Sequence, residues 1–494
     1  MARLPLAVPP GVVRRGTEYT SKGAYYDAQH VRWYPSLGPT GGWRTKTATT
    51  LTGVPRAALI WNTNSAVSWL GVGTHSKLYV MTIAGVVSDV TPTSSYTAGR
   101  ADAVASGGYG SGTYGTGVYG APRPGNAEIL DATQWTLAPW GEDLLAVSPE
   151  DGKLRQWDSS SGVGTVAATV TNSPACKAVC VTAERFVFAL ATTDPRTVDW
   201  CDQENNTVWT PSGTNQAGSF PLQTAGRLMC GAQVRGGQLL LTDQDAHIAQ
   251  YVGGIDVYGF QKAGDACGAA SRQALATFDQ QAVWMSPSVE FWAWNGGGVV
   301  PLPCDVIDYI RRDINLLQIS KVVLSQIAAH SEIEVRYCSN SSLEIDRCVV
   351  WNYKGNYWNI GRASRTAAVD KGASFRYPIQ ISSTGTIYEH EVGFDYGSDT
   401  PYATAGNIEL GNSDKIMHVL GLYPDDATEG DVTATFLVRR NQDDAGATFG
   451  PYSLTAKTDL RFCGGLIEVK WVGDELTDWR VGIPKLEVMA GEGR

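Results

Sequence analysis

Residues Asp143–Trp157, DLLAVSPEDGKLRQW, carry the pattern from which we infer the fold. An apolar run, a turn at Pro149–Gly152 and a second run ending in an aromatic residue predict a β-hairpin, because Pro, Asp and Gly favour tight turns. The unit recurs where Gln281–Met285 is followed by Val289–Trp294. Repetition of such hairpins predicts a chain built mainly of short antiparallel strands.

The aromatic residues that close these hairpins recur at a regular distance along the chain. Four-stranded propeller blades repeat about every 40–45 residues, and a closed ring of blades leaves only short sheet edges. We therefore predict an all-β protein with a β-propeller-like core. Stacked β-sandwiches are the alternative, and they would show turns every 8–12 residues without the longer period. The aromatic residues, spaced 37 to 57 residues apart, are Trp157, Trp200, Tyr251, Trp294, Trp351 and Tyr388.

Composition shifts divide the chain into a central region and two flanks. We assign residues 55–395 to the propeller, with a Gly/Tyr-rich insert at 107–125 and a helical insert at 303–330. Within the latter, apolar spacing predicts a helix over Asp305–Ile314, capped by Asp305. The flanks, residues 1–54 and 396–494, are expected to form a β platform domain from both termini. The C-terminal flank carries long β-runs at Val432–Arg439, Leu466–Val472 and Trp479–Val488.

Charge and cysteine content exclude several classes of protein. The 494 residues carry 39 Lys and Arg against 49 Asp and Glu, a net charge of −10, and 43% are hydrophobic. This hydrophobic content excludes a disordered chain, and the acidic balance argues against a protein that grips nucleic acid. No apolar run reaches 18 residues and no export signal opens the chain, so we predict no membrane insertion. Nine cysteines, an odd number, indicate buried free thiols in a reducing cytoplasm.

Motifs for cofactor or metal chemistry are weak. The chain has no phosphate-binding loop, zinc-protease motif or nucleophile elbow, so we predict no cofactor and no metal. Cys176 and Cys180 lack the second pair that a zinc ribbon needs, and we expect packed core thiols. Asp243, Asp245 and His247 fall between two apolar runs, which predicts a hairpin turn.

Glycoside cleavage is the sharpest enzymatic alternative. It requires two carboxyl groups about 5–10 Å apart beside a sugar. Glu290 lies next to Phe291, Trp292 and Trp294, but no pattern selects a second carboxylate. We therefore predict that the protein is not an enzyme, and keep a carbohydrate-binding or glycosidase-type propeller at the host surface as the alternative function.

The insert contains the clearest candidates for a contact site. Gly107–Gly120 places Tyr109, Tyr114 and Tyr119 five residues apart among glycines. Such a segment is too poor in apolar residues to bury a core of its own, whereas tyrosines are enriched at interfaces. A mobile surface loop is the alternative. We predict that the three tyrosines contact a partner or form part of a gate.

Several blocks of sequence resemble the tail nozzle (tail hub, or tail tubular protein B-like) proteins of short-tailed bacteriophages, the podoviruses. The opening blocks are Pro10–Tyr19, Gly23–Asp27, Val31–Trp33 and Gly41–Trp43, and the insert before Ala121–Pro124 is also similar. The later blocks are Thr133–Glu142, Glu344–Arg347, Trp351–Tyr353, Asn356–Trp358, Gly361, Arg365–Ala367, Asp370, Ile387–Glu391, Trp479–Gly482 and Pro484–Glu487. Cys338 and Cys348 depart from the aromatic residues expected at these positions.

The resemblance implies a structural role in the virion tail. Proteins of this family form a hexameric ring below the portal and the adaptor (head-to-tail connector) ring, and tail fibres or spikes attach around it. The ring continues the DNA channel, retains the packaged genome and lets double-stranded DNA pass at ejection without specific binding. The resemblance also implies a propeller-like core with a platform domain that meets the adaptor, and assembly in the cytoplasm of the host bacterium.

Overall fold

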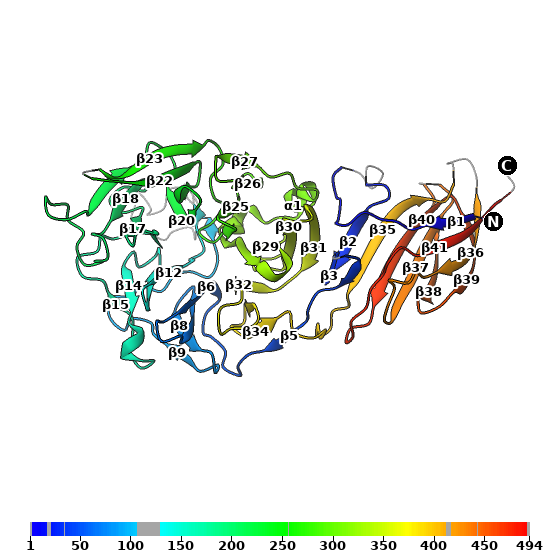
Figure 1. Ribbon diagram of the computed structural model, residues 1–494, viewed down its shortest axis with the longest axis horizontal. Helices are drawn as coiled ribbons and strands as arrows, with labels where there is room; N and C mark the ends of the chain where they lie inside the picture. The colour runs from blue at the N-terminus through cyan, green and yellow to red at the C-terminus, as the bar shows by residue number, and fades with distance from the viewer. Residues whose placement is uncertain are drawn as a thin grey trace, which may run out of the picture.

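The computed structural model describes residues 2–16, 21–33, 35–105, 129–254, 256–411, 416–441 and 443–491. Within them, seven four-stranded antiparallel sheets follow one another along the chain and make up the larger body in Figure 1. The first strand of each sheet contacts the first strands of its two neighbours, and β32 returns to β6. The sheets therefore close into a seven-bladed β-propeller, which confirms the predicted fold class.

The blades are numbered here in chain order. Blade 1 contains β6 (Pro55–Asn62), β7 (Ser68–Thr74), β8 (Leu78–Thr82) and β9 (Val87–Asp89), and blade 2 contains β12 (Thr136–Trp140), β13 (Asp143–Val147), β14 (Leu154–Trp157) and β15 (Ala168–Thr169). Blade 3 contains β16 (Ala178–Val181), β17 (Val187–Leu190), β18 (Thr197–Trp200) and β19 (Gly218–Pro221), and blade 4 contains β20 (Leu228–Val234), β21 (Gly237–Thr242), β22 (Ala246–Gly253) and β23 (Val257–Gly264). Blade 5 contains β24 (Leu275–Phe278), β25 (Gln281–Met285), β26 (Phe291–Trp294) and β27 (Val299–Pro301), and blade 6 contains β28 (Val323–Ile327), β29 (Glu332–Tyr337), β30 (Arg347–Asn352) and β31 (Tyr357–Arg362).

The repeated aromatic residues all lie on the third strand of a blade. Trp157, Trp200 and Trp294 end β14, β18 and β26, and each indole N–H donates to a backbone oxygen at 3.0 Å or less. Their rings are buried between sheets. The repeated spacing of aromatic residues in the sequence therefore reflects the position of one aromatic side chain on the third strand of each of these blades.

The last blade is completed by the start of the chain. Its strands are β32 (Arg365–Val369), β33 (Ile379–Ser382), β34 (Ile387–His390) and β5 (Trp43–Thr45), and β5 pairs with β34 through Tyr388↔Thr45. The assignment of all residues 1–54 to the platform is therefore wrong for β5. The sequence of three residues carries too little pattern to reveal a strand whose partner lies about 340 positions away.

The helical insert is shorter than predicted. It contains α1 (Ile307–Asp313) and the 3-10 helix η2 (Leu316–Lys321), but Val323–Ile327 within the expected 303–330 insert forms β28, and η3 (Ala328–His330) follows it. Asp305 does not cap α1, because it forms an ion pair with Arg15 at 3.2 Å and the N-cap position is Val306. The remaining 3-10 helix, η1 (Ser159–Ser161), lies in blade 2.

The two termini form a β-sandwich beside the propeller (Figure 1). The expected strand over Trp479–Val488 begins only at Lys485, after Pro484, which cannot donate to a ladder. One sheet has the order β1-β41-β36-β39 and the other β2-β35-β40-β37-β38. The strands are β1 (Ala2–Pro5), β2 (Tyr25–Gln29), β35 (Tyr402–Glu409), β36 (Met417–Tyr423), β37 (Val432–Arg439), β38 (Ala447–Ser453), β39 (Thr458–Gly464), β40 (Leu466–Gly473) and β41 (Lys485–Ala490). Two short hairpins, β3 (Val31–Trp33) with β4 (Leu37–Pro39) and β10 (Val104–Ala105) with β11 (Ile129–Leu130), complete the fold.

A single apolar core joins the sandwich to blades 5 and 6. It contains Phe291 and Trp358 from the propeller together with Trp33, Val469 and Trp471 from the terminal segments. Because this core crosses the boundary without a polar break, the two domains form one packed body. No helix in the described part of the chain is long and apolar enough to cross a membrane.

Candidate functional site

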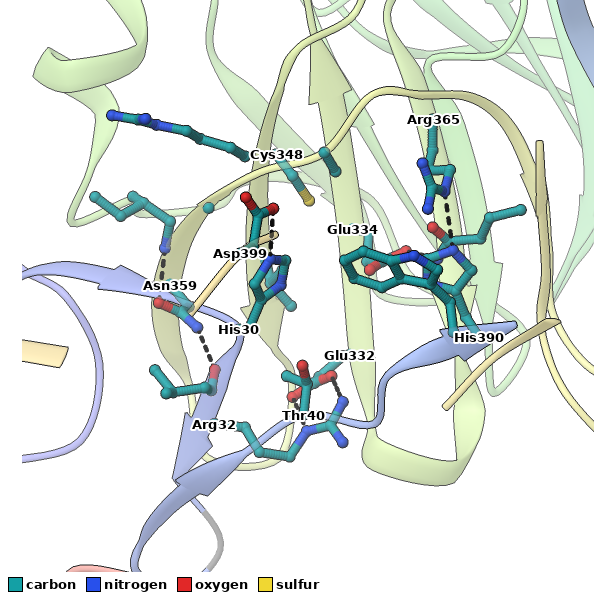
Figure 2. Close-up of a pocket in the computed structure, with 18 of the residues that line it drawn as sticks. His30, Arg32, Thr40, Glu332, Glu334, Cys348, Asn359, Arg365, His390 and Asp399 are labelled. Atoms are coloured by element: carbon teal, nitrogen blue, oxygen red, sulfur yellow. Dashed lines mark hydrogen bonds and ion pairs between the residues drawn. The ribbon is translucent and has the colours of Figure 1, made fainter. Parts of the chain in front are cut away.

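A cavity of about 390 Å³, with many charged residues in its lining, lies where the terminal hairpin meets the propeller (Figure 2). Its walls come from the β3–β4 hairpin and β5, from β29 to β31 of blade 6, and from β32, β33 and β34 of blade 7. The cavity is therefore built from segments more than 300 residues apart in the sequence. Only the closure of the ring by β5 and the docking of β3 bring them together.

Arg32 holds one wall of the cavity in place. Its guanidinium forms two-pronged hydrogen bonds with Glu332 at 2.9 and 3.2 Å and with Glu391 at 2.9 Å. The side chains of Arg32, Glu332 and Glu391 are only 12%, 6% and 16% exposed. Burial opposes ionisation of Glu391, but Arg32 and His330 outweigh it and hold the pKa of this carboxyl well below its usual range. This network joins the terminal hairpin to blades 6 and 7.

Glu334 lies deeper and in a different electrostatic setting. Its carboxylate contacts the fully buried Arg336 and accepts a hydrogen bond from Gln380 at 3.0 Å. Burial raises the pKa of Glu334, and the negative charges of Glu332 and Glu391 nearby raise it further. The positive charge of Arg336 lowers it, but does not cancel the shift. The cavity thus holds one carboxyl that favours ionisation and one that resists it.

Aromatic rings and histidines form the opposite wall. The guanidinium of Arg365 lies 5.0 Å from the centre of the Trp43 ring and 4.2 Å from that of Tyr388. Its Nε donates to Nε2 of His390 at 3.0 Å, and His390 stacks on Trp43. Burial lowers the pKa of Arg365 to about 10 and, with Arg365 nearby, lowers the pKa of His390 well below its usual value. At neutral pH the imidazole of His390 is therefore uncharged, and its Nε2 accepts the hydrogen bond from Arg365.

The charges around the cavity are not evenly paired. Glu332, Glu391, Glu334, Asp346 and Asp399 each contact an arginine or histidine. Arg365, in contrast, forms no ion pair with any described carboxylate. No group of three or more His, Cys, Asp or Glu side chains among the described residues is placed to hold a metal ion.

A second feature lies on the face of the propeller where the first strands begin. The linker from blade 1 to blade 2, called here the axial linker, comprises residues 90–105 and 129–135. It contacts five of the seven blades, so it crosses the propeller axis. Its bonds are Gly99 N to His75 O at 2.9 Å in blade 1, Arg100 to Glu150 at 2.9 Å in blade 2, Asp131 to Arg227 at 2.7 Å at blade 4, Trp135 O to Gln273 at 2.7 Å at blade 5, and Ala103 N to Gln318 at 3.0 Å before blade 6.

Fully buried charges fix the axial linker to the propeller. Arg56, at the start of β6, donates to Ala101 O at 2.9 Å and pairs with Glu344 at 2.7 Å. Lys321, with no exposed surface on its side chain, bonds to Asp102 at 2.5 Å. A buried charge is tolerated only with such partners, so the axial linker is an integral cover of this face.

The predicted contact residues Tyr109, Tyr114 and Tyr119 lie outside the described residues. The two ends of the insert are placed, because Val104 pairs with Leu130 and Ala105 with Ile129 in the β10–β11 hairpin. Val104, Ile129 and Leu130 are 52%, 53% and 41% exposed. The insert therefore leaves and re-enters the axial linker at an apolar, solvent-facing hairpin.

The other residues considered as candidates from the sequence lie in a turn, a surface ion pair or the core. Asp245 bonds to Thr242 at 2.6 Å and to His247 at 3.1 Å within the β21–β22 turn, and Glu290 forms an exposed pair with Arg311 at 3.1 Å. Eight of the nine cysteines, Cys176 and Cys180 among them, are buried free thiols, and Cys463 is exposed. Sequence reasoning assigned no role to the cavity residues, although Arg32, Trp43, Arg365, His390 and Glu391 all fall within the blocks that carry the phage resemblance.

Comparison with known proteins gives matches in fold only. No family model and no curated protein matches the chain. Among solved structures, virginiamycin B lyase from Staphylococcus aureus is 7% identical with a TM-score of 0.41, covering 69% of this chain and 97% of its own. BamB from Moraxella catarrhalis is 11% identical (TM-score 0.38, 72% and 93% covered), and exo-β-1,3-galactanase from Phanerochaete chrysosporium is 9% identical (TM-score 0.30, 92% and 100% covered).

The prediction that the protein is not an enzyme is wrong, because this fold does not exclude an enzyme. Two of the three named structures belong to enzymes, a lyase and a galactanase, so chains of broadly similar architecture include catalysts. At these identities the likeness concerns the fold alone and transfers no activity or residue to this chain.

Proposed function

We propose that this protein is a subunit of the tail nozzle ring of a short-tailed bacteriophage. In this role it continues the DNA channel below the portal and adaptor rings, retains the packaged genome and lets DNA pass at ejection. One observation carries the proposal. The sequence blocks that resemble nozzle proteins are scattered along the chain, yet many of them meet in space at the junction between the propeller and the terminal domain.

Contacts between these blocks are specific. Gly11 from the first block has a φ of +93°, and a Cβ there would lie 2.7 Å from Cβ of Tyr357. The Tyr357 hydroxyl donates to Trp33 O at 2.8 Å, and Val12 N donates to Trp358 O at 2.6 Å. Arg32 from a further block pairs with Glu391 from another. Residues shared with nozzle proteins thus serve the relative placement of two domains, which a ring subunit must fix if its channel is to have a defined width.

The path of DNA follows from the cover over the propeller. The axial linker crosses the axis on one face and is fixed there by Arg56 and Lys321. Passage through the axis of a single propeller would require the bonds of Arg56 to Ala101 O and of Lys321 to Asp102 to break. A DNA channel is therefore expected between copies of the chain, at the centre of a closed ring, as cyclic symmetry allows.

Net charge supports a conduit that does not hold DNA tightly. Lys and Arg contacts to phosphates dominate the affinity of proteins for DNA. Each copy carries a net charge of −10, so six copies carry about −60. Such a ring repels the DNA backbone overall and lets it slide.

The remaining parts of the proposal concern partners and place. The sandwich is the candidate surface for the adaptor ring, and fibre or spike proteins are expected around the ring in the virion tail. Tyr109, Tyr114 and Tyr119 remain the candidate partner or gate contacts, because the insert that carries them leaves from the face of the axial linker.

Electron microscopy tests the proposed function directly. The full-length protein is mixed with the portal and adaptor rings of candidate short-tailed phages, and particles are averaged with and without it. We expect six-fold density below the adaptor that continues its channel. A propeller-sized density bound only as isolated copies, or no binding to any connector, would contradict the proposal.

A further inference from the structure

Among the described residues, Arg365 at this cavity forms no direct ion pair with a carboxylate. The Arg365 side chain packs against Trp43 and Tyr388, and it donates hydrogen bonds to the imidazole of His390 at 3.0 Å and to the backbone oxygen of Ser364 at 3.4 Å. Both acceptors are neutral. Since a mostly buried charge is costly unless it is paired, a guanidinium in this setting is suited to an anion that enters from outside.

The planar guanidinium selects the type of anion. Arginine binds carboxylates and phosphates with two parallel hydrogen bonds. The other cavity walls carry Glu334, Asp346 and Asp399, so a doubly charged phosphate meets repulsion from several sides. A ligand with one carboxylate meets less, and the resident carboxylates can accept hydrogen bonds from its hydroxyl groups.

The size and lining of the cavity limit the rest of the ligand. A volume of about 390 Å³ is in the range of small-molecule sites. Asp399 is half exposed, and Arg362 is exposed at the same cavity, so the site opens to solvent. Asn359 and Gln380 also line the cavity, and their amide groups are bonded to Val31 O and to Glu334. A compact ring with several hydroxyl groups and a single carboxylate fits this distribution of donors and acceptors.

The geometry points to a binding site for a uronic acid, with the carboxylate of the sugar on Arg365 and its hydroxyl groups on the carboxylates of the opposite wall. The site is independent of the proposed nozzle role, because it lies within one copy of the chain. It assigns no bond cleavage, and Glu334 and Asp399 act as hydrogen-bond acceptors for the sugar.

Isothermal titration calorimetry of the full-length protein tests this site with three probes: sodium D-glucuronate, D-glucose and sodium phosphate. We expect one molecule of glucuronate to bind per chain, and glucose, which lacks the carboxylate, to bind at least tenfold more weakly or not at all. Equal binding of glucose and glucuronate, tighter binding of phosphate than of glucuronate, or no binding of glucuronate would overturn the inference.

Variants locate the binding. Arg365→Met removes the charge but keeps a side chain that packs on Trp43, and we expect at least a tenfold loss of glucuronate affinity. Arg365→Lys keeps the charge without the planar pair of donors, and we expect a smaller loss; it also serves as the second variant should Arg365→Met fold poorly. Arg311→Met, at an exposed pair on another part of the surface, should bind as the wild type does. Unchanged affinity in both Arg365 variants would place the ligand elsewhere and refute the site.

Discussion

At the residue scale, buried arginines do different work according to what faces them. Arg32 meets two carboxylates and joins three parts of the chain, whereas Arg365 meets two aromatic rings and a neutral imidazole. A pair such as Arg32–Glu391 adds specificity of placement, because no other arrangement satisfies both groups. A guanidinium that forms no ion pair with any described residue, such as that of Arg365, can still bind an anionic ligand.

Removal of Arg32 should be strongly destabilising. Arg32→Met leaves Glu332 and Glu391 buried without their main partner, and breaking buried pairs of this kind costs about 3–5 kcal/mol. Urea unfolding followed by tryptophan fluorescence measures the loss. Arg44→Met is the control, because Arg44 is 60% exposed in its pair with Glu389 and should change stability by about 1 kcal/mol or less. A similar small loss in both variants would contradict a structural role for the Arg32 network.

His390 should make the protein less stable in acid. Its pKa lies well below 6.5 in the folded state, so the unfolded chain takes up a proton first as the pH falls. Stability linked to His390 is therefore present above pH 6.5 and is lost progressively below it. The difference in urea midpoint between pH 7.5 and 5.5 should be smaller in His390→Gln than in the wild type.

The matched control for this titration is His418→Gln, on the exposed part of β36. It should keep the wild-type difference between the two pH values. An equal difference in all three proteins would show that the His390 ring does not contribute to acid sensitivity.

At the element scale, hairpins within blades, such as β13–β14 and β25–β26, were predictable from the sequence, and the ring closure was not. Trp157, Trp200 and Trp294 mark third strands because a large ring is buried there in these three blades, and this repetition leaves a period in the sequence. β5 has three residues, two of them exposed, and its partner is β34. Its strand identity depends on a pairing partner far along the chain, which local pattern cannot report.

The candidate cavity was hidden for the same reason. Trp43 lies on β5 and Arg32 on the β3–β4 hairpin, so neither is near Arg365 or Glu332 until the ring closes. The resemblance to nozzle proteins included these residues without assigning them a site. Composition and motif spacing report only neighbours in sequence, whereas this site joins residues 30–43 to residues 332–399.

Gly11 provides a test of the junction between the N-terminal segment and β31. Gly11→Ala places a methyl group 2.7 Å from Cβ of Tyr357, at a φ of +93°. Gly162, with a φ of +79° and no atom within 4 Å of the added carbon, is the matched control. Gly162→Ala should cost about 1 kcal/mol from backbone strain alone, and Gly11→Ala about 1–3 kcal/mol more from overpacking. Thermal unfolding of both variants measures the difference, and equal losses would mean that the junction yields to the methyl group.

At the scale of the whole molecule, the chain combines a covered propeller with a terminal sandwich through one apolar core. The propeller and the sandwich are packed together and not merely tethered, because β2 of the sandwich contacts β31 of blade 6. The segment before β2 also bonds to blade 6, where Val12 N donates to Trp358 O. Rotation of the sandwich relative to the propeller would therefore disrupt the apolar core that the two domains share. Any gate in the proposed ring is expected in surface segments rather than in rotation of whole domains.

The insert at the axial linker is the segment where this expectation can be tested. Val104 and Ala105 pair with Leu130 and Ile129, so residues 106–128 can be replaced by Asn-Gly, a dipeptide that closes two-residue hairpins. The shortened protein should unfold at the same temperature as the wild type, because the pairing of β10 with β11 is kept. If the three tyrosines serve as partner or gate contacts, phage carrying the deletion should assemble tails poorly or lose packaged DNA, measured as the yield of DNA-filled particles.

A second variant separates the side chains from the length of the segment. Replacing Tyr109, Tyr114 and Tyr119 with Ser keeps all 23 residues from 106 to 128 and removes only the aromatic rings. The two variants should share the same defect if the rings make the contact, whereas a defect in the deletion alone would assign the role to the backbone of the segment. Normal infectivity and normal DNA retention in both would refute a partner or gate function for the insert, and would leave the apolar hairpin at its base to be explained by another contact.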